Sequence, residues 1–245
     1  VIRASREKEL IDCLRDIKTK INHPQSRDIH FQQLKDDEKR LVICDHIADF
    51  PLRCFCVISN KKNMRGYSNR RAQIVPTRNW FYCWMCRLLL ERVTTFCSWR
   101  NAIDGIPNAK LKIEFSERGG MSYSQFRAYL QWIRLQSQGN ALFLKRDLDW
   151  SVIDTALIEA FGHRSRAGLQ LADVVASSFY QAVDLKSDGT CRPHFAKALK
   201  PRMAFDSSKN IADFGVKAMP SPLWKAGLTD TQKEIFEFYG YRTER

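Results

Sequence analysis

A single long apolar segment, RAGLQLADVVASSFYQAV over residues 166–183, constrains the fold more than any other part of the chain. Apolar residues recur in it at helical spacing, which predicts a buried helix over about residues 166–184. Asp173 is the one carboxylate in this segment and lies between Ala172 and Val174. Burying a carboxylate is costly unless it is paired or bound to a metal. Asp173 is therefore either a salt-bridged helix acid or part of a polar site, and the pattern alone leaves both readings open.

Helices and strands alternate along the rest of the chain. Periodicity and capping residues predict helices over about 6–21, 36–50 and 77–99, one capped by Ser122 or Ser124, and a last one from Thr229 to near Gly240. Strands are expected over 52–59 and 110–116, with one or two more within 141–161. This order predicts an α/β domain over residues 1–184. The proline-dotted residues 185–245 are expected to form a loop-rich C-terminal extension packed on that core.

The charge balance points to polyanionic partners. The chain has 40 Lys and Arg against 27 Asp and Glu, a formal net charge of +13. Such an excess favours nucleic acid, because bound cations release condensed counterions, although a merely solvated basic surface is the plainer reading. No uncharged apolar run reaches the roughly 18 residues of a membrane span, so we expect no membrane partner.

The eight cysteines lie mostly among apolar neighbours, where reduced thiols act as small hydrophobes. This usage favours the cytoplasm. Cys83 and Cys86 form a C-x-x-C pair, but a structural zinc site needs a second pair. We therefore expect these two cysteines to be buried helix positions.

Two further residues have positions typical of site residues. Glu117 directly follows the strand KLKIEFS and precedes a glycine turn, and functional side chains of α/β sheets gather beyond the carboxyl ends of strands. Glu114 is a competing acid within that strand, and an exposed turn is the plainer reading of Glu117. His30, in DIHFQQLK, can shuttle protons or contact phosphate, although a lone histidine is more often structural.

Basic residues near these positions are candidate nucleic-acid contacts. They are Lys35 beside His30, Arg118 beside Glu117, and the helix entry His163, Arg164 and Arg166. A basic loop adds Lys61, Lys62, Arg65, Arg70 and Arg71, with Tyr67 as a stacking residue. Contacts of this kind bind the nucleic-acid backbone without sequence specificity.

Several segments together resemble the family called domain of unknown function 3800. They are HFQQLK, FSERGG, RAGLQLADVVASSFY, HFAKALKPRM, DFGVKAMP and FEFYGY, and they span most of the chain. The resemblance implies an RNase H-like fold, a mixed sheet flanked by helices, and a metal-dependent nuclease, in a phage-defence or mobile-element setting. It further implies that Glu117 and Asp173 are catalytic acids that bind Mg²⁺ or Mn²⁺, with His30 as a nearby catalytic participant.

The chain departs from the family at its start. Members open with a strand ending in Asp-Glu-Ser-Gly, a tetrapeptide that this sequence lacks. Val1-Ile2 resembles the end of a second strand, so we expect an incomplete N-terminus with a further acid upstream. Two other functions stay open. One is an inactive nucleic-acid- or protein-binding module. The other is a structural subunit that docks a protein partner through residues 185–228.

Overall fold

The chain forms two units. The structure, a computed structural model, describes residues 1–61, 79–139 and 147–245. Its contacts divide the chain into unit 1, Val1–Lys61 with His163–Arg245, and unit 2, Lys62–Gly162. The mixed α/β class is confirmed by helices together with short parallel sheets. The expected boundary after residue 184 does not coincide with this division, because residues 185–245 share unit 1 with residues 1–61.

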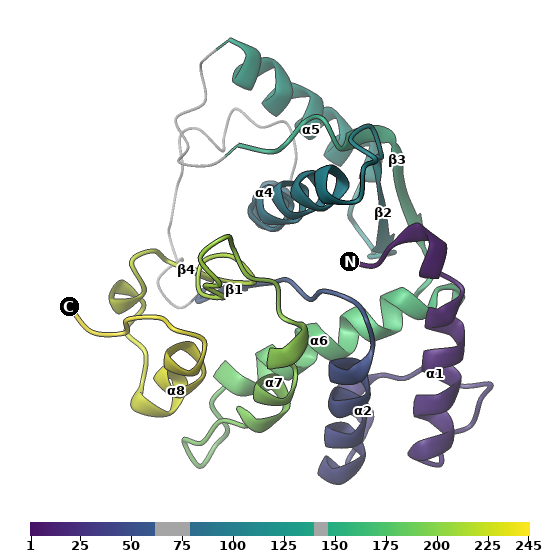
Figure 1. The fold of residues 1–245 in the computed structure, drawn as a ribbon. Coiled ribbons are helices and arrows are strands. Elements are labelled where there is room, and N and C mark those ends of the chain that lie inside the picture. The colour runs from purple at the N-terminus through teal and green to yellow at the C-terminus, as the bar shows by residue number, and fades with distance from the viewer. Residues whose placement is uncertain (62–78, 140–146) are drawn as a thin grey trace. The chain divides into compact units, whose positions relative to one another are not determined.

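Helix α6, Ala167–Val183, is the central helix of unit 1, close to the predicted 166–184. It contacts α1 (Glu9–Lys20), α2 (Asp37–Asp49), α7 (His194–Ala198) and α8 (Asp230–Phe238), which follow one another along it in Figure 1. Its buried face carries Leu171, Val174, Val175, Phe179 and Ala182. The predicted apolar helix therefore supplies the middle of the unit 1 core.

Unit 1 also contains a two-stranded parallel sheet of β1, Cys56–Ser59, and β4, Val216–Met219. The sequence predicts a longer first strand, from residue 52, and no strand at β4. Residues 185–245, the C-terminal tail, contribute side chains to the core itself. Phe195, Leu199, Met203 and Val216 are all fully or almost fully buried in it. The tail is therefore an integral part of unit 1.

Capping side chains begin the helices where the sequence predicts. Asp36 accepts hydrogen bonds from the backbone N–H groups of Glu38 and Lys39 at the start of α2. Thr229 and Gln232 form the predicted capping box of α8. Short 3-10 helices are η1 (Ala4–Arg6), η2 (Phe31–Gln33), η4 (His163–Ser165), η5 (Lys200–Arg202) and η6 (Leu223–Ala226).

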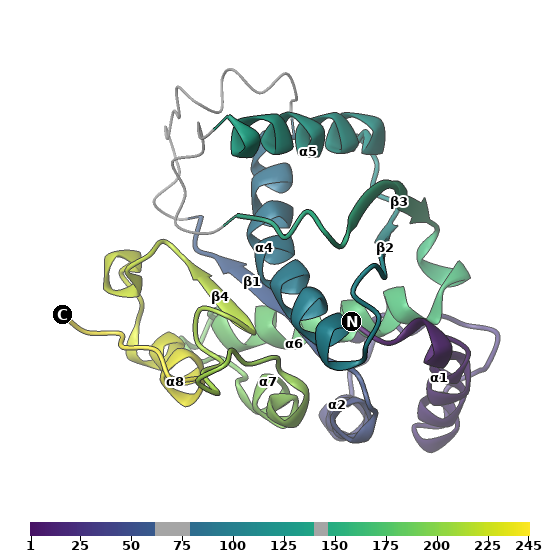
Figure 2. The same cartoon turned by 45° about the horizontal axis from the view of Figure 1, so that its top comes forward.

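Unit 2 consists of α4 (Trp80–Ile103), β2 (Leu111–Ser116), α5 (Tyr123–Gln138) and β3 (Ile153–Phe161). Strands β2 and β3 pair in parallel, and Figure 2 shows them side by side. Ser122 caps α5 as expected. Within the described residues, the region expected to hold one or two short strands forms one nine-residue strand. The described strands thus pair in two separate parallel sheets rather than in one mixed sheet.

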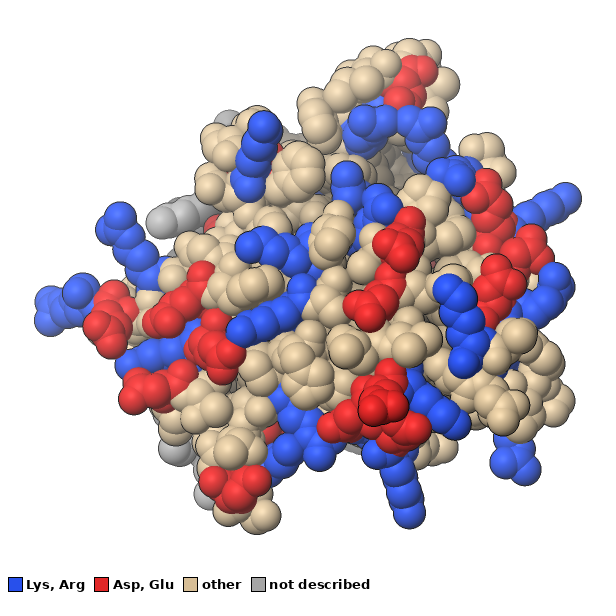
Figure 3. Space-filling model, turned by 60° about the horizontal axis from the view of Figure 1, so that its bottom comes forward, with Lys and Arg blue, Asp and Glu red and all other residues tan. Residues whose placement is uncertain are grey.

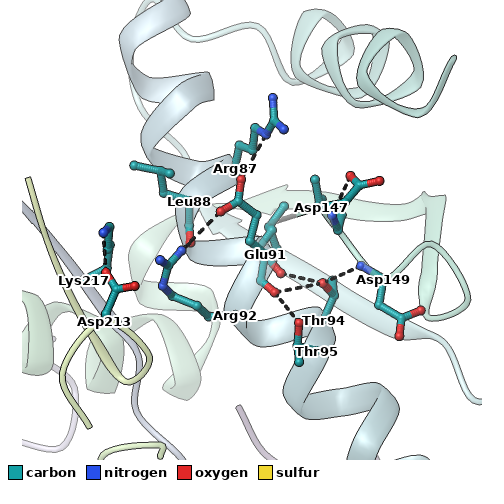
Figure 4. A network of polar contacts seen from close by, with 12 residues as sticks. Arg87, Leu88, Glu91, Arg92, Thr94, Thr95, Asp147, Asp149, Asp213 and Lys217 are labelled. Atoms are coloured by element: carbon teal, nitrogen blue, oxygen red, sulfur yellow. Dashed lines mark hydrogen bonds and ion pairs between the residues drawn. The ribbon is translucent and has the colours of Figure 1, made fainter. Parts of the chain in front are cut away.

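Helix α4 buries three charged side chains, which pair with one another. Glu91 accepts from Arg87 at 3.2 Å through Oε1 and from Arg92 at 3.3 Å through Oε2 (Figure 4). Burial raises the pKa of Glu91, and the two arginines oppose that rise. These pairs explain how charged residues are accommodated in an otherwise apolar helix.

All eight cysteines are free thiols, and four of them are buried. Cys83 and Cys86 both lie in α4, as expected; Cys83 is buried in the unit 2 core, and the partly buried Cys86 packs against that core. Burial raises the pKa of both Cys44 and Cys56 to about 12, so these thiols stay protonated at neutral pH. None of the helices in the described residues combines the length and the apolar character that a membrane crossing requires.

Gly215, just before β4, is the glycine that the fold most requires. A Cβ atom at this position would collide with the backbone carbonyl of Ala204. We predict that Gly215→Ala lowers the stability of unit 1 by about 1–3 kcal/mol, because the backbone must shift to admit the methyl group. Thermal unfolding of Gly215→Ala and of Gly162→Ala, whose Cβ would meet nothing within 4 Å, measures the effect. Equal melting temperatures for the two variants would contradict it.

Candidate metal centre

The site is built on residues 28–33, which lie within the connection between α1 and α2 and are called the 28–33 segment below. The side chains of its first residues are alternately exposed and buried, as in an extended chain. Ile29 and Phe31 are completely buried in the unit 1 core. Asp28 and His30 keep 20% and 44% of their side chains exposed. The apolar residues therefore anchor the segment and leave a carboxylate and an imidazole at the surface.

Helix α6 holds the backbone N–H groups of this segment. The side-chain oxygen of Gln170 accepts from the Ile29 N–H at 3.0 Å, and Asp173 Oδ2 accepts from the Phe31 N–H at 3.4 Å. Gln170 and Asp173 are three residues apart and so share one face of the helix. Together they hold the backbone on both sides of His30.

The backbone carbonyl groups of the segment also have hydrogen-bond partners. The buried Arg40 donates to the Phe31 carbonyl and the Gln32 carbonyl, each at 3.2 Å. His163, from η4, lies 3.3 Å from the Ile29 carbonyl through Nε2. An irregular segment whose buried polar groups are satisfied by side chains has one well-defined conformation.

Three side chains that are potential metal ligands lie close together at the 28–33 segment. One ligand atom each from Asp28, His30 and His163 lie within 4.8 Å of one another. His30 Nε2 is 3.7 Å from Asp28 Oδ2, and the rings of His30 and His163 stack with centroids 4.7 Å apart. The 3.7 Å separation exceeds a hydrogen bond, and the 4.8 Å limit of the group is wider than the roughly 3.3 Å between two ligands of a tetrahedral ion with bonds of about 2.0–2.1 Å, so the side chains would have to move closer together to hold one.

The hydrogen bond of His163 sets its tautomer. A carbonyl oxygen only accepts, so Nε2 carries the proton that is donated to Ile29. The neutral ring then has its lone pair on Nδ1, which is the nitrogen that would bind a metal in this tautomer. Metal-binding histidines commonly donate their other N–H to a backbone carbonyl in this way.

A cavity of about 340 Å³ adjoins the group. It is lined by His23, Ser26, Arg27, Asp28, His30, Gln33, Leu34 and Arg164. Arg164 contacts both the Ser26 carbonyl and, at 3.7 Å, the Asp28 carboxylate. The nearby Lys18 has its pKa lowered by burial, with Asp28 raising it and Arg164 lowering it. Cationic groups therefore outnumber the single acid around this cavity.

Unit 1 brings together four residues that the sequence singled out: His30, His163, Arg164 and Asp173. Asp173 is half-buried and its second oxygen accepts from Ser177 Oγ at 3.5 Å, but it is not a member of the three-ligand group. Arg166 is the N-cap residue of α6, and Lys35 and Lys61 are exposed outside the cavity lining. The helix entry and the 28–33 segment thus form one site.

Glu117 and Arg118 belong to unit 2. Glu117 is exposed just after β2, and its backbone N–H donates to the Phe161 carbonyl at 2.9 Å. The Arg118 guanidinium lies 4.0 Å from the centre of the Tyr82 ring. The competing acid Glu114 pairs with Lys112 at 2.7 Å. A metal shared by Glu117 and Asp173 stays a prediction.

Most of the predicted basic loop, Lys62, Arg65, Tyr67, Arg70 and Arg71, lies outside the described residues. On the face drawn in Figure 3, basic and acidic side chains are interspersed. The net charge of +13 is therefore not gathered into one basic stripe on this face.

The sequence interpretation missed Asp28 and Gln170. The alternation of Asp28 and His30 with Ile29 and Phe31 was the available signal for Asp28. Gln170 is 2% exposed, and a glutamine within an apolar helix pattern indicates a buried hydrogen-bond partner.

Comparisons with protein-family models, with curated proteins and with solved structures find no match to this chain. The resemblance to domain of unknown function 3800 therefore stays a prediction.

Asp173 offers a test of how the segment is held. An asparagine keeps an oxygen that accepts from Phe31, whereas a leucine leaves that N–H without its partner. We predict that the free energy of unfolding of Asp173→Asn lies within about 0.5 kcal/mol of the wild-type value. That of Asp173→Leu is expected to be lower than the wild-type value by about 1–2 kcal/mol. Chemical denaturation measures both values. Equal stability of the leucine and asparagine variants would show that Asp173 does not hold the segment.

Proposed function

We propose that the protein is a metal-dependent nuclease that hydrolyses phosphodiester bonds of RNA or DNA at the site on unit 1. The observation that carries the proposal is the convergence of Asp28, His30 and His163 on a fixed segment beside a cationic cavity. The RNase H-like fold and the cytoplasmic location that the sequence suggests belong to the same proposal. The eight free cysteines, with no disulfide between them, support that location.

The donor set decides which ion fits. Mg²⁺ prefers oxygen ligands in octahedral geometry, whereas imidazole suits later divalent metals such as Zn²⁺. Two imidazoles and one carboxylate therefore favour Mn²⁺ over Mg²⁺ of the two ions expected from the sequence, with Zn²⁺ as a further candidate. A bound ion of this kind activates water and stabilises the leaving oxygen of a phosphodiester.

The residues of the chain have separate tasks in this proposal. Asp28, His30 and His163 hold the metal, and Gln170 and Asp173 keep the backbone around His30 in place.

Arg27 and Arg164 bind the non-bridging phosphate oxygens, since guanidinium groups match phosphate geometry. His23 has Nε2 bound to the Asp28 carbonyl at 3.1 Å, so its Nδ1 is able to accept a proton. Asp173 and Glu117 stay proposed as additional acids of the reaction.

The test uses labelled single- and double-stranded RNA and DNA with Mn²⁺, Mg²⁺, Zn²⁺ or a chelator. We predict cleavage that requires metal and that falls by about 100-fold or more in Asp28→Asn and in His163→Gln, because each removes a ligand. Asp45→Asn and His46→Gln are matched controls on α2 and are expected to cleave like wild type.

Two results would contradict the nuclease. One is a folded wild-type protein that cleaves none of the substrates with any of the metals. The other is unchanged cleavage in both ligand variants. Salt-sensitive binding of nucleic acid without cleavage and without metal dependence would favour the inactive binding module instead.

A further inference from the structure

We infer that the cavity beside the metal group receives one unpaired nucleotide, so that the substrate is a single strand or a frayed end rather than the interior of a duplex. This inference rests on the proposed function for its link to cleavage. It names the substrate class that the same site recognises. Three properties of the cavity carry it, namely its size, its cations and its remaining wall.

The size of the cavity sets the first limit. Its volume of about 340 Å³ is at the small end of the range of about 300–1,000 Å³ for small-molecule pockets. Such a volume accommodates a ligand of about one nucleotide. A nucleotide within a duplex would have to leave the stack to enter, which costs unpairing and unstacking energy, whereas an unpaired nucleotide avoids most of that cost.

The cations of the cavity are placed for a phosphate. Arg164 has 72% of its side chain exposed, yet the Ser26 carbonyl and the Asp28 carboxylate hold its position. Arg27 also lines the cavity. Within the described residues, no ion pair or hydrogen bond of its guanidinium is found. Two arginines beside the metal ligands therefore provide bidentate donors for phosphate oxygens.

The remaining wall suits a base. Leu34 is partly buried against the unit 1 core and gives an apolar surface, and the His30 ring gives an aromatic one. Gln33 is exposed at the cavity and has both a donor and an acceptor in its amide. A wall of one apolar, one aromatic and one amide group binds a base with little sequence preference.

The first test is calorimetric binding of adenosine and uridine 5′-monophosphates in the presence of chelator. We predict that both nucleotides bind, that adenosine alone and inorganic phosphate each bind more weakly, and that Arg164→Gln weakens nucleotide binding about tenfold or more. Arg15→Gln is the matched control, since Arg15 is an exposed arginine of α1 paired with Asp12. Absence of nucleotide binding, or equal binding in Arg164→Gln and wild type, would overturn the inference.

The second test compares a labelled oligonucleotide as a single strand and as a blunt duplex of the same sequence, again with chelator. The inference predicts a preference of about thirtyfold or more for the single strand, and it predicts that Arg164→Gln reduces this preference. Equal affinity for the two forms would contradict it. Because neither measurement involves cleavage, both results stand whether or not the protein proves to be a nuclease.

Discussion

The two hydrogen bonds from α6 to the 28–33 segment are the interactions on which the site depends. Gln170 binds the Ile29 N–H and Asp173 binds the Phe31 N–H, so the backbone around His30 follows the position of the helix. The same helix is the centre of the unit 1 core. Burial of α6 therefore fixes the backbone that carries His30.

This arrangement gives Asp173 a specific role. It is neither a solvated surface acid nor one of the three clustered ligands. It binds the N–H group next to His30, which makes it a support for this candidate ligand. Residues that orient metal ligands are often as important for metal affinity as the ligands themselves. A functional effect of changing Asp173 is thus compatible with a position outside the metal group.

The sequence predicted the elements whose signals are local. Helix α6, strand β2 and the caps at Asp36, Ser122 and Thr229 follow from spacing and from capping chemistry within a few residues. Strand β4 was not predicted, because Val216–Met219 is short and depends on its partner β1. A four-residue strand has too few positions to show its period.

The candidate site was predictable only in part for the same reason. His30, His163 and Arg164 were found from their chemistry and position, but Asp28 joins them through contacts between segments more than 130 residues apart, such as that of His163 with Ile29. Nothing in a single sequence encodes that pairing directly. The buried Gln170 is similar, since its partner is the distant backbone N–H of Ile29.

The central claim is that Asp28, His30 and His163 bind one metal ion on unit 1. X-ray absorption spectroscopy of the Mn²⁺- or Zn²⁺-loaded protein tests it most directly, because imidazole ligands give a characteristic outer-shell signal. The account predicts one ion per chain with two imidazole nitrogens and at least one oxygen, and loss of one imidazole in His163→Gln. A bound ion with sulfur ligands or without imidazole, or a spectrum unchanged in His163→Gln, would contradict it.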